Sequence, residues 1–304
     1  MKKIYILLFF VMMFWGFNLS AIKVLVANID PIQLTAVRIF VAGISVLLIS
    51  YAMGFFRLPK KNELLTILII AIFNVIVHHS LLGIGLSLTS GVNASLIMGT
   101  GPLLTVILSI IFLRDRITRL RVIGFLLGFF GIAMTSLVDT SELSSLSIGD
   151  IMVFLSILSQ AFSFIMISKL NPNFDPRLLT GYMLTTGSFF ILLVSLVVEG
   201  IPHQIGALFS WKLGLIFLFS AVMCTAFGHM TYNFAIKQVG PVETAIFINL
   251  NTFFSILGAT IFLDESLLIQ HLVGLILILI GVFMGSGALE YMIRKRKSQS
   301  KQAS

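Results

Sequence analysis

This 304-residue chain contains little charge and a single cysteine. Charged residues make up 11% of it and hydrophobic residues 58%, whereas a soluble protein carries about 25% charged residues. The composition therefore excludes an ordinary water-soluble fold. Because Cys224 is alone, it rules out an internal disulfide and a metal–thiolate cluster. We expect Cys224 to be a small buried residue, and we predict no cofactor and no metal site.

Enzyme motifs are also missing. The chain has no HExxH, no GxSxG, no phosphate-binding glycine loop and no cluster of carboxylates inside an apolar stretch. Without a nucleotide-binding loop an ATP-driven pump is disfavoured, and no connection is long enough for a sensory domain. We therefore predict that the protein is not an enzyme. A membrane-embedded enzyme and a non-transporting membrane scaffold stay open as alternatives.

What the chain does contain is a series of long apolar stretches. A bilayer core of about 30 Å needs roughly 20 apolar residues in a helix. The sequence therefore predicts an all-α integral membrane protein with ten transmembrane helices. The predicted spans are 4–26, 32–53, 64–87, 91–113, 119–138, 149–169, 178–198, 211–235, 241–263 and 268–288.

The basic residues lie on one side of these spans. The net charge is +8, but the basic residues flank apolar stretches and form no basic domain, so we expect no nucleic-acid partner. The positive-inside rule predicts a multi-pass protein with both termini in the cytoplasm. The opposite side has only Lys212. The predicted cytoplasmic set is Lys2, Lys3, Arg57, Lys60, Lys61, Arg114, Arg116, Arg119, Arg121, Lys169, Arg177, Lys237, Arg294, Lys295, Arg296, Lys297 and Lys301.

The two halves of the chain resemble each other. A shift of 150 positions places 111–134 on 261–284 with seven identities, including two glycines, and aligns Asp115 with Glu265. Five spans in each half, an odd number, make the halves inverted, which is the geometry of alternating access. We predict one five-helix repeat over 1–140, an inverted repeat over 147–288 and a basic cytoplasmic tail over 289–304.

Several motifs resemble the EamA-type branch of the drug/metabolite transporter superfamily. They are Phe14-Trp15-Gly16-Phe17-Asn18, Arg38 early in the second helix, the Gly101-Pro102 step, and the helix ends at Asp115 and Glu265. The resemblance implies a plasma-membrane carrier of a small organic metabolite, such as an amino-acid-like compound or a drug, and favours export. Thr252 stands where a proline would mirror Pro102, which leaves open whether the ninth helix bends as the fourth does.

Polar residues inside spans are costly and therefore mark candidate sites. The shift maps His79 onto His229 and Gly99 onto Asn249. Histidine changes its charge near neutral pH, so both histidines are candidates for substrate binding or proton exchange, with interhelical hydrogen bonding as the alternative. Two polar stripes are expected to face each other across a wet cavity, with close helix packing as the alternative for the serine stripe. They are Thr225, His229, Tyr232 and Asn233, and Ser156, Ser159, Gln160 and Ser163.

Further candidates lie at the helix ends and on the first helix. Trp15 and Asn18 share one helix face, which suits an organic substrate or ordinary packing. Lys23 and Arg38 are placed to attract an anionic substrate, with snorkelling of Lys23 or pairing of Arg38 to an acid as alternatives.

Two carboxylates and a set of glycines complete the candidates. Glu243 is a coupling candidate or a helix N-terminal acid, and Glu265 is a gate candidate. The substrate-binding set is Trp15, Asn18, His79, Gln160, His229, Tyr232, Asn233 and Asn249, and the coupling or gate set is Lys23, Arg38, Glu243 and Glu265. Glycines 124, 128, 131, 274, 281 and 285 predict tight helix packing. The expected partners are a small-molecule substrate and the lipid bilayer, and a homodimer is left open.

Overall fold

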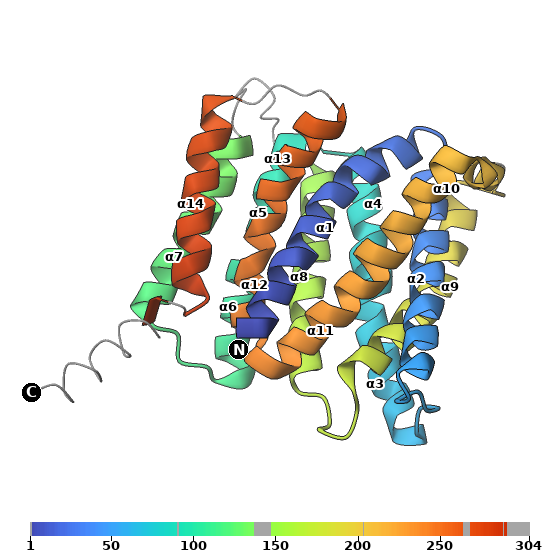
Figure 1. Ribbon diagram of the computed structural model, residues 1–304, viewed down its shortest axis with the longest axis horizontal. Coiled ribbons are helices and arrows are strands. Elements are labelled where there is room, and N and C mark those ends of the chain that lie inside the picture. Colours follow the sequence, from blue (N-terminus) through green and yellow to red (C-terminus); the bar gives the residue numbers. More distant parts are fainter. Residues whose placement is uncertain are drawn as a thin grey trace, which may run out of the picture.

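The first half of the chain forms a set of helices (Figure 1). The structure is a computed structural model, and it describes residues 2–89, 91–136, 147–202, 204–263, 268–287 and 289–290. The third helix changes from α to π geometry and back, and the fourth is interrupted at Thr100. The elements are α1 (Lys2–Val26), α2 (Pro31–Ala52), α3 (Lys61–Ala71), the π-helix η1 (Ile72–Val77), α4 (His78–Ser87), α5 (Gly91–Gly99), α6 (Gly101–Leu113) and α7 (Arg119–Ser136).

The second half follows the same order. Its eighth predicted span again contains a π-helix, η4, and its ninth is interrupted by a short 3₁₀ turn, η5. That turn precedes Thr252, so the ninth span departs from α geometry although it lacks the proline of the fourth. The elements are α8 (Ile148–Ser168), α9 (Pro176–Val198), the 3₁₀ turn η3 (Ile205–Phe209), α10 (Trp211–Leu218), η4 (Phe219–Phe227), α11 (Gly228–Val239), α12 (Pro241–Ala245), η5 (Ile246–Ile248), α13 (Asn249–Leu263) and α14 (Ile269–Gly285).

Helix bounds agree with the internal repeat. A shift of 150 positions carries the start of α3 onto that of α10, the starts of α5 and α7 onto those of α12 and α14, and η1 into η4. Equivalent helices also make equivalent contacts in the two halves. The first helix, α1, packs on η4 and α11 of the second half, and its counterpart α8 packs on η1 and α4 of the first half. The similarity between the halves, which the sequence shows over 24 residues, therefore extends over most of each half in the structure.

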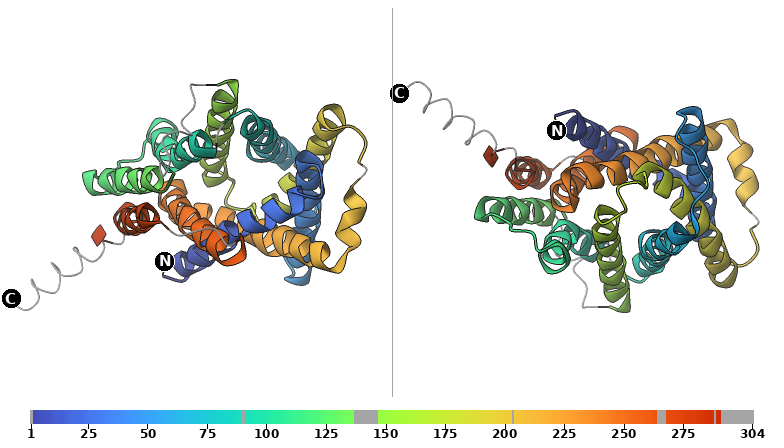
Figure 2. Two further views of the ribbon diagram at one scale, coloured as in Figure 1. Left: turned by 90° about the horizontal axis from the view of Figure 1, so that it is seen from above. Right: turned by 90° about the horizontal axis from the view of Figure 1, so that it is seen from below.

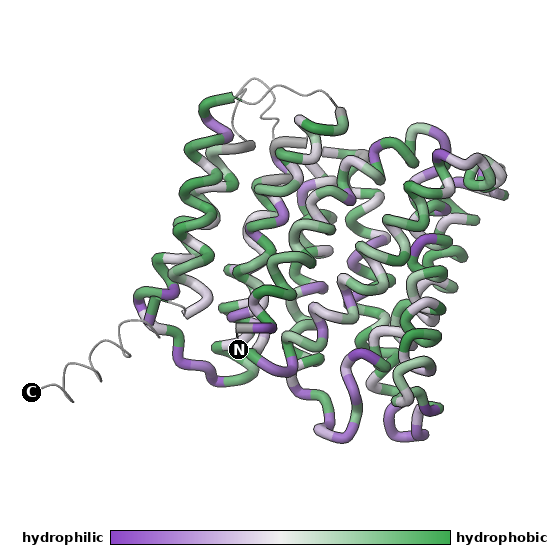
Figure 3. Tube along the Cα trace, viewed as in Figure 1, coloured by the Kyte–Doolittle hydropathy of each residue, from purple (hydrophilic) through white to green (hydrophobic). Residues whose placement is uncertain are grey.

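The described residues are helical throughout their long elements and contain no strand. Helices satisfy their own backbone hydrogen bonds, which hydrocarbon requires. Among the described residues, eight helices are long and apolar enough to cross a membrane, and Ile269–Gly285 is apolar but shorter. Polar residues gather in the connections, and the helices are mostly hydrophobic (Figure 3). The connections after α2, α6 and α8 lie at the same end as the start of α1 (Figure 1).

Most helices form a ring and two stand aside. Seen along the bundle, α1, α2, α4, α8, α9 and α11 surround its middle, and α7 and α14 form a pair at one edge (Figure 2). A long-range cap fixes α2 in the ring, because the Glu199 carboxylate accepts hydrogen bonds from the backbone N–H groups of Ile32 and Gln33 at 2.8 and 2.9 Å. The free N–H groups at the start of α2 are thus satisfied by the end of α9.

Glycines bring α7 and α14 into backbone contact. A Cβ on Gly281 would lie 2.6 Å from the nitrogen of Gly128 and 2.7 Å from the oxygen of Gly124. Likewise, a Cβ on Gly131 would lie 2.7 Å from the oxygen of Gly274. The two helices run antiparallel, since residues early in α7 meet residues late in α14. The tight packing predicted for these glycines is confirmed.

We predict that Gly281→Ala destabilises the protein, because the added methyl group meets backbone atoms that cannot turn away. The expected loss is about 1–3 kcal/mol. Thermal unfolding is measured with a thiol-reactive dye, since Cys224 is fully buried in the folded state. The matched control is Gly206→Ala, where a Cβ would meet nothing within 4 Å. Equal unfolding midpoints for the two variants would contradict the close α7–α14 contact.

Candidate functional site

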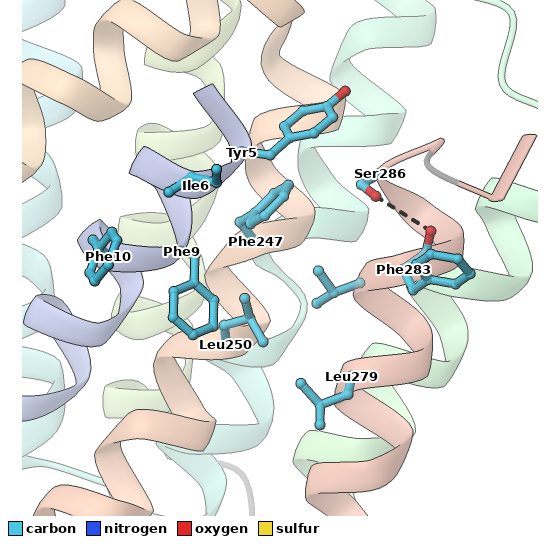
Figure 4. Close-up of a pocket in the computed structure, with 10 residues that line it drawn as sticks. Tyr5, Ile6, Phe9, Phe10, Phe247, Leu250, Leu279, Phe283 and Ser286 are labelled. Atoms are coloured by element: carbon cyan, nitrogen blue, oxygen red, sulfur yellow. Dashed lines mark hydrogen bonds between the residues drawn. The ribbon is translucent and has the colours of Figure 1, made fainter. Parts of the chain in front are cut away.

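Two hollows lie on the outside of the bundle, and the first is a poor candidate for a polar site. A groove of about 530 Å³ lies between α1, the η5–α13 segment and α14 (Figure 4). Its lining is almost wholly apolar, and the Ser286 hydroxyl in it bonds the Phe283 carbonyl at 3.4 Å. No polar groups converge there, as specific binding of a polar metabolite requires. The lining is Tyr5, Ile6, Phe9, Phe10, Phe247, Leu250, Leu279, Val282, Phe283 and Ser286.

The second hollow, of about 300 Å³, lies at the end of the bundle that holds the α6–α7 connection. Glu243 lies here and pairs with Arg121 at 2.5 Å, and Arg121 also contacts Glu290 at 3.4 Å. This ion pair joins α7 of the first half to α12 of the second. Glu243, predicted as a coupling or gate residue, is therefore in a salt bridge between the halves.

A polar cluster in the middle of the bundle is centred on Thr225. The Arg38 Nη1 donates to the Thr225 hydroxyl at 2.8 Å, and that hydroxyl donates to the Ser220 carbonyl at 2.8 Å. The Thr225 carbonyl is 3.0 Å from the His229 Nδ1. Because a carbonyl only accepts, Nδ1 of His229 carries a hydrogen. One residue of the π-helix η4 thus positions both a guanidinium and an imidazole.

The π geometry explains this arrangement. In a π-helix the backbone bonds run to the fifth residue back, and π-helices are frequent at functional sites. The hydroxyl of Thr225 reaches Ser220, which is five residues earlier. The sequence predicts an i, i+4 stripe for Thr225 and His229, but it gives no sign of the π-helix that turns Thr225 towards Arg38.

Aromatic rings cover one side of the cluster. The Trp15 indole Nε1 donates to the Cys224 carbonyl at 2.8 Å, and its ring lies 5.0 Å from His229 and 5.2 Å from Tyr232. Tyr232 is 1% exposed, and its hydroxyl has no hydrogen-bond partner among the described residues. The structure therefore brings together three predicted site residues from α1 and α11.

His79 belongs to the same region. It interacts electrostatically with Arg38, His78 and His229, and its buried Nε2 has no hydrogen-bond partner within the described structure. His79 and His229 are only partly buried although they lie deep in the bundle. The two histidines that the internal repeat relates are therefore close enough to interact electrostatically.

His78 has a different role, which the sequence did not indicate. Its Nδ1 lies 2.8 Å from the Ser156 hydroxyl, which donates to the His78 carbonyl at 2.8 Å. Its Nε2 lies 2.9 Å from the Gln160 amide nitrogen. These bonds fit a neutral imidazole that donates through Nδ1 and accepts at Nε2. Gln160, a predicted site residue, is therefore held to α4 by His78.

The serines of α8 also bond to the third span. Ser159 donates to the Phe73 carbonyl at 2.8 Å, and Asn74 donates to Ser163 at 2.7 Å. For these serines the expectation that the α8 stripe faces the α11 stripe across a cavity is wrong, and the alternative of close helix packing is confirmed. Their hydroxyl groups satisfy backbone and side-chain groups of η1, because that π-helix packs directly on α8.

Other predicted residues lie apart from the cluster. The Asn233 amide donates to the Thr180 hydroxyl of α9 at 2.9 Å. Asn249 is buried against Gly128 of α7, and Lys23 is exposed near the end of α1. Asn18 is 7% exposed, with an unpartnered Oδ1. Glu265 lies outside the described residues.

The cluster was therefore found in part from the sequence. Trp15, Arg38 and His229 were candidates, whereas Thr225 was only one member of a stripe and His78 was passed over. Their roles depend on which helices face each other, and helical spacing carries no such information. The π-helices alter the spacing further.

Comparisons with known proteins agree with a membrane carrier. The model of the EamA-like transporter family matches residues 2–137 and 147–286. An uncharacterized transporter of Bacillus subtilis, YyaM, is 25% identical over 98% of each chain. An uncharacterized transporter of Archaeoglobus fulgidus is 27% identical over 97% of this chain and all of that one.

A solved structure supports the fold. A crystal structure with 15% sequence identity superposes with a TM-score of 0.75 and covers 94% of this chain and 97% of its own. At this identity the likeness concerns the fold alone. The family match covers both halves of the chain, one copy in each. The protein belongs to the EamA-like transporter family.

Proposed function

We propose that the protein is a secondary transporter that moves a small organic metabolite across the plasma membrane by alternating access. The observation that carries the proposal is the Thr225 cluster. It lies in the middle of the bundle and combines Trp15 and Arg38 of the first half with Thr225, His229 and Tyr232 of the second. A site at the interface of two repeats is typical of secondary transporters.

The proposed topology is ten spans in two inverted halves. α7 and α14, which the shift of 150 residues relates, run antiparallel. In this topology α7 and α14 are the fifth and tenth spans, and both termini lie in the cytoplasm. Rocking of one half against the other then opens the Thr225 cluster to one side at a time.

Export is the proposed direction, and the proposed role is not enzymatic. The relatives bear the name transporter. The cluster combines aromatic rings, a guanidinium and imidazoles, and the nearby Cys224 thiol donates to the Phe14 carbonyl at 3.3 Å and not to an imidazole. Such groups bind and orient a molecule. Nucleophilic chemistry needs an activated attacking group.

We predict that cells overproducing the protein accumulate one or a few small molecules in the medium, and that the double variant Trp15→Ala/His229→Ala loses at least nine-tenths of this export. Both side chains border the site, so their loss removes contacts to the substrate. Metabolite profiling of the medium measures the effect, and flux into liposomes containing only the purified protein confirms it.

The matched control for this experiment is Trp211→Ala/His271→Ala, which removes the same residue types away from the cluster. Trp211 is 83% exposed, and His271 lies at the start of α14. The control variant should export normally. An unchanged medium together with no flux for the profiled molecules in either direction in liposomes would contradict a transport function. Equal losses in both double variants would contradict the site.

The topology gives a separate prediction. In a Cys224→Ser background, Lys212→Cys should react with a membrane-impermeant maleimide in intact cells, because Lys212 is exposed on the proposed outer side. Arg116→Cys, equally exposed in the α6–α7 connection, should react only after the cells are permeabilised. The reversed pattern would overturn the proposed orientation, and labelling of both sites in intact cells would overturn the two-sided topology.

A further inference from the structure

Arg38 is a positive charge inside the apolar part of the protein. It is the eighth residue of α2, so it lies about 10 Å along the helix from Pro31 at 1.5 Å per residue. Only 8% of its surface is exposed. A charged side chain at such a position is costly, and charges inside spans usually pair or line a substrate path.

No acid neutralises this charge within the described structure. The ion pairs there join Arg57 to Glu63, Arg121 to Glu243 and Glu290, and Arg177 to Asp175. The hydrogen bond of the Arg38 side chain runs from Nη1 to the neutral Thr225 hydroxyl. A guanidinium has five N–H donors, so one threonine oxygen leaves most of its capacity and all of its charge unmatched.

The described neighbours of Arg38 supply no carboxylate. Cys224, His79 and His229 interact electrostatically with it. The Cys224 thiol donates to the Phe14 carbonyl at 3.3 Å, and an imidazole is neutral or positive.

The Trp15 ring beside His229 is only partly buried and offers an apolar face, whereas Tyr232 is 1% exposed and packs against Trp15 and Phe164. The region therefore combines an unpaired planar cation with aromatic surface at the interface of the two halves.

The planar shape of the Arg38 guanidinium group favours some anions over others. Guanidinium presents parallel N–H groups that match the two oxygens of a carboxylate, and such bidentate pairs are among the strongest hydrogen bonds in proteins. A small inorganic anion would satisfy the charge but would leave the aromatic faces unused. An organic carboxylate satisfies both.

We propose that the transported substrate is a small organic carboxylate whose carboxylate pairs with Arg38 and whose apolar part packs on Trp15. This inference rests on the proposed transport function and names the substrate class of its site. The substrate supplies a counter-charge that the described residues do not, so Arg38 is the residue that distinguishes an acid from its uncharged analogue.

The test compares acids with their amides in size-matched pairs. The chain has two tryptophans, so Trp211→Phe leaves Trp15 as the only tryptophan reporter beside the site. The purified variant is titrated with butyrate and butyramide, lactate and lactamide, and phenylacetate and phenylacetamide. We expect a saturable change in Trp15 fluorescence for at least one acid, with an affinity at least tenfold above that of its amide.

Substitutions of Arg38 test whether its charge causes the preference for an acid over its amide. Arg38→Gln should reduce the acid-to-amide ratio to about one, and Arg38→Lys should keep part of it because the charge is retained. Arg116→Gln, an exposed arginine outside the cluster, should behave as the parent. Unfolding midpoints of all variants show that each is folded, and the Lys variant carries the test if the Gln variant is not.

Several outcomes would overturn the inference. Equal binding of an acid and its amide, no acid binding at 10 mM, or discrimination that survives Arg38→Gln would each do so. A response to chloride or sulfate that equals the response to the acids would point to a simple anion site instead. If the protein exports a neutral or cationic metabolite and Arg38→Gln still exports it, the carboxylate proposal fails and the transport function stands.

Discussion

The structure depends on one constraint, that backbone groups inside a bilayer find hydrogen bonds within the protein itself. Helices meet this constraint, and the long apolar stretches in the described part of the chain are helical. The departures from α geometry are therefore informative. η1 and η4 occur at equivalent places in the two halves, and their residues bond to groups on other helices, Asn74 to Ser163 and Thr225 to Arg38.

The same constraint explains how the helices are held together. Lipid is as apolar as the helix surfaces, so association relies on close packing and hydrogen bonds between helices. Glycines let the backbones of α7 and α14 touch. His78, Ser156 and Gln160 join α4 to α8 through neutral hydrogen bonds. Polar residues in the spans thus form two groups. One group makes hydrogen bonds that hold helices together, and the other, around Arg38 and Thr225, has hydrogen-bonding groups that are not satisfied in the described structure.

That division separates the two histidines that follow each other in the chain. His78 has partners at both ring nitrogens and belongs to a helix contact, whereas the buried Nε2 of His79 has none among the described residues. The difference arises because adjacent residues on a helix point about 100° apart, so one faces α8 and the other faces the interior. Neighbouring positions of one helix therefore serve two purposes, His78 in a helix contact and His79 in the proposed binding region.

The sequence alone determined the fold class, the extents of the helices, the repeat and the glycine contact, because hydrophobic length, small residues and self-similarity are local or periodic properties. It also marked Trp15, Arg38 and His229, since polar groups stand out in apolar spans. The tertiary structure decided their partners. It joined Arg38 to Thr225, turned Asn233 to Thr180 and bound the α8 serines to η1. Which side chains meet depends on helix rotation and packing across 53 to 187 residues of chain, and no local pattern encodes that.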